Sequence, residues 1–280
     1  MNDAAPTNSV AGDVARFTDV DLTPDARFFV EFMDAANALP DNRRLKRLVA
    51  DRLHLSPGTR VLDVGCGTGD DARALASLIG ETGRVVGIDA SATMIDVARQ
   101  RSRDGSLPIE FALGDALALD FPDDAFDACC CCWGVLMHVD GEPAQAVKEM
   151  IRVTRPGGQV VIFDFHWDAF AIDHPDQATT RAVVHAVCDG IRHGWIGSQL
   201  PRLMADAGLT EIEVEGHAVQ IPHPLFHRLL DGHLTQAQQD GRLGETEINQ
   251  WWHPLDEAAR SDGPFMASLL AIIATGTVSG

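Results

Sequence analysis

The sequence predicts an α/β fold: a Rossmann-like, doubly wound and mostly parallel seven-stranded sheet, with an N-terminal helical cap and a helical lid insertion near the C-terminus. Two observations support this prediction. From Thr59 onward, short β-branched runs alternate with helical stretches rich in Ala, Leu and Arg, which is typical of a parallel sheet covered by helices on both faces. A glycine-rich run then falls between the first strand and the first helix of that pattern, at the edge where such sheets bind ligands.

The expected elements follow from the apolar runs and the breakers between them. Residues 1–55 form the predicted cap, with helices over 24–38 and 42–54, and the second helix ends at the breaker Ser-Pro-Gly. Residues 56–165 form the predicted core of alternating strands and helices. Its expected strands cover 60–64, 84–88, 109–113, 126–133 and 159–165, and its expected helices cover 70–79, 92–102 and 143–153.

The C-terminal region, residues 166–280, is less regular and completes the same predicted domain. Residues 176–207 predict one or two helices with a break near Gly190 and Gly194, and strands are expected over 210–221 and 265–278. Between these strands lies an insertion, residues 222–263, of about forty residues. An insertion of this size beside an open sheet is typical of a lid or a binding element, so we expect it to contribute to substrate recognition.

The charge is strongly acidic: 22 Lys and Arg residues stand against 41 Asp and Glu residues in 280, which gives a net charge of −19. Such a field repels phosphate backbones and anionic lipids. No stretch reaches the roughly 18 apolar residues of a membrane span, and residues 1–12 lack the pattern of a secretory signal. We therefore expect a cytoplasmic protein with no nucleic-acid and no membrane partner, and its oligomeric state leaves no mark in the sequence.

The six cysteines predict neither a metal site nor a disulfide framework. Four of them are consecutive, 129–132, inside an apolar stretch. Because side chains on a strand alternate between its two faces, four neighbours cannot converge on one tetrahedral ion. We expect small buried thiols and no metal.

The glycine loop contains Gly65, Gly67 and Gly69, and its neighbours argue against a dinucleotide. The third glycine of a G-x-G-x-x-G motif would fall at Asp70, so the spacing of an NAD site fails. Asp70 and Asp71 also place negative charge in the first turn of the following helix, where a pyrophosphate would rest. These carboxylates favour a ligand that carries positive charge, such as a sulfonium with an ammonium, over an NAD-dependent oxidoreductase.

Two further aspartates follow the second and third expected strands. Asp89 comes 24 residues after Gly65, where a carboxylate can accept both hydroxyls of a ribose. Asp115 can accept the exocyclic amine of an adenine. Each aspartate taken alone can also be a helix cap or a solvated strand end, but their joint placement favours a nucleoside ligand.

The motifs in order are Val-Leu-Asp-Val-Gly-Cys-Gly-Thr-Gly at 61–69, Val-Val-Gly-Ile-Asp-Ala-Ser-Ala-Thr-Met at 85–94, Gly-Asp-Ala at 114–116 and Thr-Arg-Pro-Gly-Gly at 154–158. This series resembles class I S-adenosylmethionine-dependent methyltransferases, and most of all the small-molecule group that includes the ubiquinone and menaquinone biosynthesis C-methyltransferases. The resemblance covers residues 59–165 and thins out on either side.

The resemblance implies a role for each matching residue. Asp63 would hold the ammonium of the cofactor directly or through water, Asp89 would take the ribose hydroxyls, and Met94 would pack on the adenine. The residues after the fourth strand would lie close to the methyl group. The implied cofactor-binding residues are Asp63, Gly65, Cys66, Gly67, Gly69, Asp89, Ala90, Met94, Gly114, Asp115, Ala116, Cys132 and Trp133.

The acceptor side has weaker signals. A general base, if the reaction uses one, is expected at His166 or His138, which follow the fifth and fourth strands. Either histidine can instead be satisfied by backbone groups. Substrate recognition is expected from Trp167, Arg192, Trp195, Trp251 and Trp252, although tryptophans also close the core of small helical subdomains. Because Trp251 and Trp252 are adjacent, we expect at least one of them to line an opening.

The predicted function is transfer of a methyl group from S-adenosylmethionine to O, N or C of a small organic acceptor, with a role in secondary metabolism. The alternative is a protein of the same fold that binds S-adenosylmethionine but acts as a cyclase or as a non-methylating partner. Residues 166–263 match no motif, so the sequence leaves the acceptor open.

Overall fold

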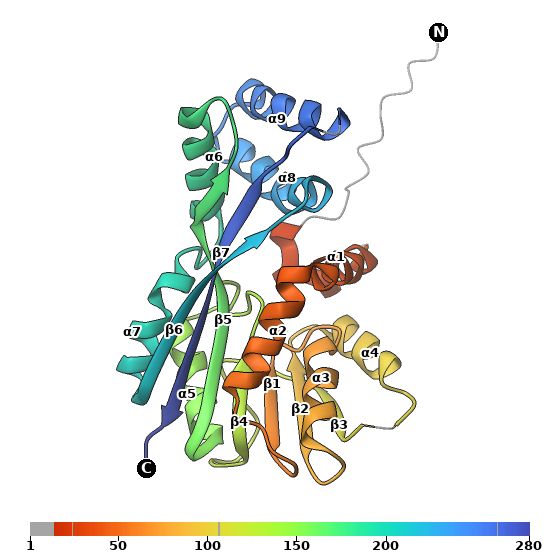
Figure 1. Cartoon of the computed structure of the whole chain (residues 1–280), viewed down its shortest axis with the longest axis vertical. Helices are drawn as coiled ribbons and strands as arrows, with labels where there is room; N and C mark the ends of the chain where they lie inside the picture. The colour runs from red at the N-terminus through yellow and green to blue at the C-terminus, as the bar shows by residue number, and fades with distance from the viewer. Residues whose placement is uncertain (1–13, 24, 106, 262) are drawn as a thin grey trace.

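The computed structural model describes residues 14–23, 25–105, 107–261 and 263–280. One seven-stranded sheet runs through it in the order β3-β2-β1-β4-β5-β7-β6. Of these described strands, β7 alone runs in the opposite direction to the others (Figure 1). The predicted α/β fold class is confirmed. The strands are β1 (Arg60–Val64), β2 (Arg84–Asp89), β3 (Ile109–Leu113), β4 (Phe126–Cys131), β5 (Thr154–Ile172), β6 (Leu209–Gln220) and β7 (Ala267–Val278).

Helices cover the sheet and extend beyond it. They are η1 (Val14–Leu22), α1 (Ala26–Ala38), α2 (Pro40–Arg52), α3 (Asp70–Ile79), α4 (Ala92–Arg101), α5 (Pro143–Val153), α6 (Gln177–Gly190), α7 (Ile196–Asp206), α8 (His223–Gln239) and α9 (Glu245–Arg260). The central strands are continuous apolar runs because both of their faces are covered. The cysteines at 129–132 lie in and just after β4, and all of them are buried free thiols, as expected.

The largest departure from the expected elements is β5, which has 19 residues where the sequence predicts seven, at 159–165. After an irregularity between His166 and Phe170, β5 continues to pair with β7 as far as Ile172. The polar residues after Phe165 hide this continuation from an apolar-run analysis. The long strands β5, β6 and β7 rise out of the sheet and carry α6, α8 and α9 at their far end (Figure 1).

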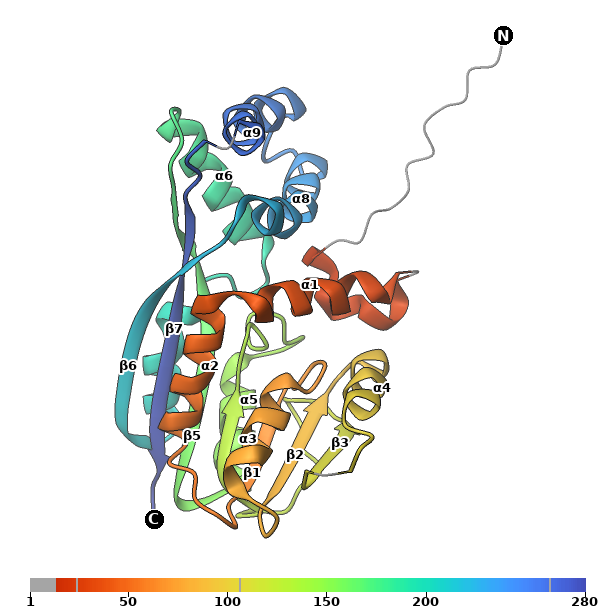
Figure 2. The ribbon, with the colours of Figure 1, turned by 45° about the vertical axis from the view of Figure 1, so that its right-hand side comes forward.

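The N-terminal helices join the sheet to these upper helices. α2 packs on β5 and β6, and Arg52 pairs with Glu215 and, at 3.2 Å, with Glu213 of β6. α1 runs between α4 and α8 (Figure 2). The sequence did not predict η1, whose backbone departs from helical angles at Arg16 and Asp19 and whose pattern has no clear period. Residues 1–13 of the predicted cap, and Pro24 at the start of its first helix, lie outside the described residues.

The insertion 222–263 contains α8 and α9, and one of its residues, 262, also lies outside the described residues. The expectation that Trp251 or Trp252 lines an opening was wrong: their exposed fractions are 1% and 7%. Both rings contact Phe226, and Trp252 stacks on His227 at 4.3 Å. α9 is covered by α6 on one side and by α8 on another, so adjacent residues can both be buried.

The division into cap, core and C-terminal region stays a prediction. No helix within the described ranges is long and apolar enough to cross a membrane.

Candidate active site

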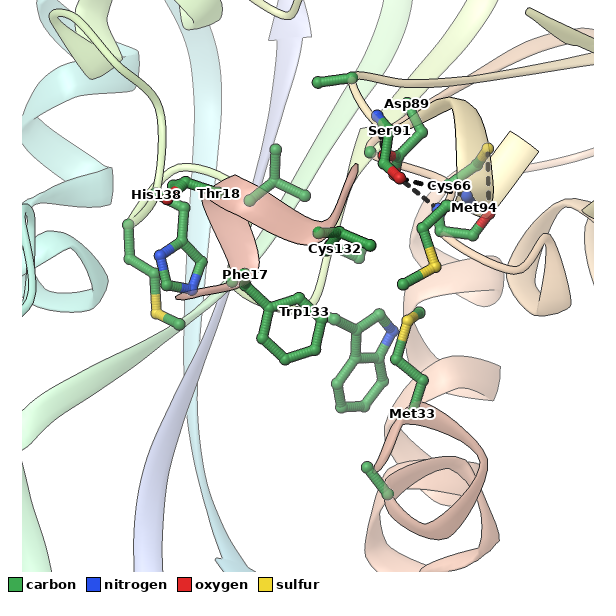
Figure 3. Close-up of a pocket in the computed structure, with 18 of the residues that line it drawn as sticks. Phe17, Thr18, Met33, Cys66, Asp89, Ser91, Met94, Cys132, Trp133 and His138 are labelled. Carbon is green, nitrogen blue, oxygen red and sulfur yellow. Dashed lines mark hydrogen bonds between the residues drawn. The ribbon is translucent and has the colours of Figure 1, made fainter. Parts of the chain in front are cut away.

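A cavity of about 640 Å³ lies where β1, β2, β3 and β4 end, and its volume is in the usual range for a small-molecule site. η1, α1 and α2 cover it on one side, while β5, β6, β7 and α8 close its far end. In Figure 3, η1 crosses the cavity, with Asp89 and Met94 on one side, His138 on the other, and the Phe17 and Trp133 rings below it. Residues from all three regions that the sequence analysis treats separately, 1–55, 56–165 and 166–280, therefore line one cavity.

The glycine loop follows β1 and forms one wall of this cavity. Gly65 has φ 74°, and a Cβ atom there would overlap the side chain of Val135. Gly69 has φ 78° and lies away from the cavity, where a Cβ atom would come within 2.7 Å of the Phe111 ring. The loop is fixed by Gly67, whose N–H donates to Asp89 Oδ2 at 2.8 Å. Gly65 and Gly67 thus face the cavity, whereas Gly69 allows helix and strand to pack closely.

Carboxylates at the ends of β2 and β3 retain capacity to bind a ligand. Asp89 also accepts from the Ser91 N–H at 2.9 Å, and burial raises its pKa. Each oxygen of Asp89 keeps a lone pair for a further donor. Asp115 accepts from the Leu117 N–H at 2.8 Å through one oxygen, which leaves the other free within the described residues. Both carboxylates line the cavity, as a ribose and an adenine amine would require.

The structure brings eleven of the thirteen predicted cofactor residues to the cavity: Gly65, Cys66, Gly67, Asp89, Ala90, Met94, Gly114, Asp115, Ala116, Cys132 and Trp133. Gly69 is one exception. Asp63 is the other, since it is 2% exposed and lies beneath the floor, where the Cys130 thiol donates to it at 3.5 Å. Burial, and then the charge of Asp71, raise the pKa of Asp63 to about 7. Direct contact between Asp63 and an ammonium is therefore not supported, and an indirect role through water stays a prediction.

The acidic first turn of α3 is less negative than the sequence indicates. Asp71 pairs with Lys46 at 2.7 Å, and Asp70 pairs with Arg73 at 2.7 Å. Lys46 comes from α2, lines the cavity and lies 5.0 Å over the Trp133 ring. The prediction counted the two carboxylates without these cations: Arg73 is visible in the sequence three residues after Asp70, whereas only the fold brings Lys46 of α2 beside Asp71. Lys46 is thus a residue of this site that the sequence analysis missed.

Trp133 and the turn that follows it carry the base candidate. Trp133 has φ 67°, a strained value for a bulky residue of the kind found at functional sites. His138 lines the cavity, and burial, followed by the charges of Arg192 and His193, lowers its pKa to about 4. The turn is held at Met137, whose N–H donates to Asp164 at 3.3 Å and whose sulfur accepts from the Trp167 indole at 2.9 Å. His138 is thus neutral and held in place.

His166 does not reach the cavity. Phe165 and Trp167 line it, and because side chains of a strand alternate between faces, His166 points to the other side, where its ring meets Trp195 at 5.1 Å. The sequence analysis placed His166 after the fifth strand, whereas it lies inside β5, which continues to Ile172, and on the face turned away from the cavity. Of the five predicted recognition residues, all of them described, Trp167 alone lines the cavity. Arg192 pairs with Asp140, Trp195 is 47% exposed, and Trp251 and Trp252 are buried among the upper helices.

The half of the cavity away from Asp89 has mostly apolar walls, supplied by Phe17, Phe32, Leu39, Phe165, Trp167, Val219, Ile221, Leu225, Leu229 and Leu269. Most of these residues were missed by sequence analysis, because they come from η1, α1, β6, β7, α8 and the junctions at Leu39 and Ile221, and they meet only in the fold. Asp21 of η1 was also missed. It accepts from Ser91 Oγ, at 2.8 Å, and from the N–H groups of Ala92 and Thr93 at the start of α4.

Residues 61–158 match the model of a family described as a methyltransferase domain. This segment is a methyltransferase domain. S-Adenosylmethionine is its cofactor, and the resemblance to class I S-adenosylmethionine-dependent methyltransferases is confirmed. The cavity fits that cofactor, since the methyltransferase domain presents one carboxylate at the end of β2 and another just after β3, beside a loop that has glycines at the two positions facing the cavity, 65 and 67.

Proteins similar to this chain align with only part of it. An uncharacterized 37.1 kDa protein in a transposon of Streptomyces fradiae is 42% identical over 183 residues, which cover 65% of this chain and 52% of that protein. The 2-phytyl-1,4-naphtoquinone methyltransferase of Synechococcus elongatus is 40% identical over 127 residues, covering 45% of this chain and 54% of the enzyme. The chain thus spans about half the length of the curated relatives it matches.

Among solved structures, the [4+2]-cyclase SpnF is similar with a TM-score of 0.53 and 26% identity, covering 85% of this chain and 82% of the cyclase. The methyltransferase domain therefore occurs within a fold that also carries other chemistry.

Proposed function

We propose that this protein is an S-adenosylmethionine-dependent methyltransferase whose acceptor is a small, largely apolar molecule. The observation that carries the proposal is one continuous cavity, in which the carboxylate-lined half continues into the apolar half. Relatives named as quinone methyltransferases support an acceptor of this character. Whether O, N or C receives the methyl group stays open, as do the predicted cytoplasmic location and a role in secondary metabolism.

The cofactor half would hold the nucleoside through the ends of β2 and β3. Asp89 would accept the ribose hydroxyls, Asp115 and Ala116 would meet the adenine edge, and Met94 would pack on its face. When bound, the cofactor supplies a methyl group on a sulfonium, which is open to in-line displacement. The chain itself has to hold the acceptor near Cys132 and Trp133, in line with the methyl group and the sulfur, and to exclude water. Such positioning is the main contribution of the protein to this kind of reaction.

His138 is the base that the structure supports. Its imidazole is neutral near pH 7 because its pKa is about 4, so a ring nitrogen has a lone pair that can accept a hydrogen bond, and then a proton, from the acceptor, although the low pKa makes it a weak base. We expect His138→Gln to lower kcat by about 10²-fold with little change in KM, as loss of a positioned base does. The measurement is the steady-state rate of S-adenosylhomocysteine formation. A kcat within twofold of wild type would show that transfer needs no base at this position.

The cofactor assignment is tested by calorimetry with S-adenosylmethionine and S-adenosylhomocysteine. We expect wild-type protein to bind both, and Asp89→Ala to weaken both by about tenfold or more, because a charge-assisted hydrogen bond is lost. Asp96→Ala is the matched control, since Asp96 lies on α4 and is 80% exposed. Absence of binding at millimolar cofactor would contradict the proposal.

A second candidate, supported by the likeness to the cyclase SpnF, is a cyclase that keeps the cofactor without consuming it. Incubation with methyl-labelled S-adenosylmethionine and a panel of apolar hydroxylated and amino acceptors separates the two functions. A methyltransferase releases S-adenosylhomocysteine and labels the acceptor. Conversion of an acceptor to an isomer of equal mass, without S-adenosylhomocysteine, would favour the cyclase.

A further inference from the structure

One lysine lies in a cavity wall whose other charged residues are aspartates. We propose that Lys46 binds the carboxylate of the cofactor's methionine part, so that the protein discriminates S-adenosylmethionine and S-adenosylhomocysteine from their decarboxylated forms. This inference rests on the proposed function, because it assumes that the carboxylate-lined half of the cavity binds the cofactor.

Lys46 is the cation that the cavity offers to an anionic group. Among the described residues that line the cavity there is no arginine and no other lysine, whereas aspartates lie in the first turn of α3, at the end of β2 and just after β3. His138 adds no positive charge at pH 7 because its pKa is about 4. The cofactor has one anionic group, the carboxylate of its methionine part. Because the aspartates repel that carboxylate, a cation has to lie beside it.

The order of the strands places Lys46 at the methionine part of the cofactor and not at the nucleoside. β3, β2, β1 and β4 are neighbours in the sheet, with Asp115 just after β3 and Asp89 at the end of β2. Lys46 Nζ lies 2.7 Å from Asp71, which follows β1 and the glycine loop, and 5.0 Å from the centre of the Trp133 ring, which follows β4. A cofactor whose adenine and ribose occupy the ends of β3 and β2 extends next over β1 and β4, where it meets this ammonium.

The ammonium lies at the cavity wall and has donors to spare. Lys46 lines the cavity, and so do Asp71 and Trp133, the two residues that its Nζ contacts. The Lys46 side chain is 16% exposed, so it is neither sealed inside the protein nor free in solvent. An ammonium has three N–H groups, and the hydrogen bond to Asp71 Oδ1 uses one of them. A ligand carboxylate can therefore accept from a second N–H without displacing Asp71.

Asp71 and Trp133 hold the ammonium in place before the cofactor binds. Fixing a lysine side chain costs rotamer entropy, and here the ion pair and the ring already fix it in the folded protein. A bound carboxylate extends the pair into a row of alternating charges through a charge-assisted hydrogen bond. A decarboxylated cofactor cannot form that bond, and its own ammonium adds positive charge near Lys46 without a carboxylate between them. The site therefore favours the form that keeps the carboxylate.

Calorimetry on the full chain tests this preference with S-adenosylhomocysteine and decarboxylated S-adenosylhomocysteine, which differ in the carboxylate alone. We expect wild-type protein to bind S-adenosylhomocysteine about tenfold more tightly, the effect of one charge-assisted hydrogen bond. A crystal structure of the complex should place a carboxylate oxygen about 2.8 Å from Lys46 Nζ. Equal affinities, a preference for the decarboxylated form, or a carboxylate that contacts other groups and not Lys46 would overturn the inference. If neither compound binds at millimolar concentration, the proposed function itself fails.

Three variants complete the test. Lys46→Met keeps an apolar stem without the ammonium, so it should bind S-adenosylhomocysteine about tenfold more weakly and leave the affinity for the decarboxylated form unchanged. Lys46→Arg keeps the positive charge and should retain the preference, which separates loss of the charge from a folding defect in Lys46→Met. Lys148→Met is the matched control, because Lys148 is the other lysine of the chain and is exposed on α5. If Lys46→Met weakens both compounds equally, or if Lys46→Arg loses the preference, Lys46 does not bind the carboxylate and the inference fails.

Discussion

At the residue scale, two fully enclosed aspartates lie behind the active site. Burial raises the pKa of Asp164 to about 7, even though its carboxylate accepts from the N–H groups of Met137, at 3.3 Å, and Phe165, at 2.8 Å. Burial likewise raises the pKa of Asp63 to about 7. Asp164 binds the turn that carries His138. The base candidate is therefore oriented by a carboxyl group whose charge is costly to bury.

Asp164→Asn tests this cost. The ordinary pKa of the group is 3.8 and the folded value is about 7, so the folded protein binds the proton more tightly than the unfolded chain does. The contribution of Asp164 to stability is therefore most favourable below about pH 4 and is lost as the pH rises toward 7. In urea unfolding at pH 5, 6, 7 and 8, the variant should lose less stability than wild type as the pH rises. Parallel curves for the two proteins would contradict this assignment.

At the level of single residues, the sequence analysis found cavity-lining residues where they belong to motifs of consecutive residues. Asp89 and Asp115 were identified because each ends a strand inside a recognisable motif. His166 was misplaced because β5 continues past 165, and inside a strand alternate side chains point to opposite faces. Lys46 was missed because a single Lys on an amphipathic helix has no distinguishing pattern, and its place in the site depends on where the fold puts α2.

At the element scale, η1 covers both halves of the cavity. Its Phe17 ring lies 6.2 Å from that of His138 in the acceptor half, and its Asp21 binds the start of α4 beside the cofactor half. Burial opposes the charge of Asp21, but hydrogen bonds from Thr93 and Ser91 lower its pKa. A carboxylate at a helix N-terminus is also favoured by the helix dipole. Because η1 borders both halves of the cavity, we expect it to affect how a ligand enters and leaves.

Asp21→Ala should loosen this cover. We expect S-adenosylhomocysteine to dissociate several-fold faster, and the free energy of unfolding to fall by about 1 kcal/mol, the usual cost of losing a helix cap. Stopped-flow displacement and urea unfolding give the two quantities. Asp25→Ala is the matched control, because Asp25 precedes α1 and its side chain makes no capping hydrogen bond. An unchanged dissociation rate would mean that η1 does not limit ligand exit.

At the scale of the whole molecule, the net charge of −19 opposes folding through self-repulsion. Exposed pairs such as Arg84 with Glu110, at 2.7 Å, offset this repulsion only slightly, since such pairs contribute about 0–1 kcal/mol each.

The fold class was predictable because the alternation of strands and helices is a property of long segments. The length of β5 was not predictable, because its outer part is held by pairing with β7 and not by an apolar pattern.

Salt should therefore stabilise this protein. Raising NaCl from about 0.02 M to about 0.5 M shortens the screening length from roughly 20 Å to roughly 4 Å, so repulsion between distant carboxylates weakens more than contact pairs do. We expect the melting temperature to rise by several degrees in scanning calorimetry. An uncharged osmolyte series in parallel separates screening from preferential exclusion. A falling melting temperature would show that ion pairs outweigh the repulsion.

The continuation of β5 beyond its irregularity, as far as Ile172, has a consequence for how the acceptor range can change. Phe165 and Trp167 on β5, Val219 on β6 and Leu269 on β7 line the acceptor half, yet all belong to strands anchored in the same sheet that holds the cofactor residues. The segment that joins β6 to β7 closes the far end without interrupting that hydrogen-bonded ladder. Exchanging this segment for one from another enzyme would change the end of the cavity that it closes. The acceptor-half residues on β5, β6 and β7 would keep their positions relative to the cofactor residues, because they belong to the same sheet.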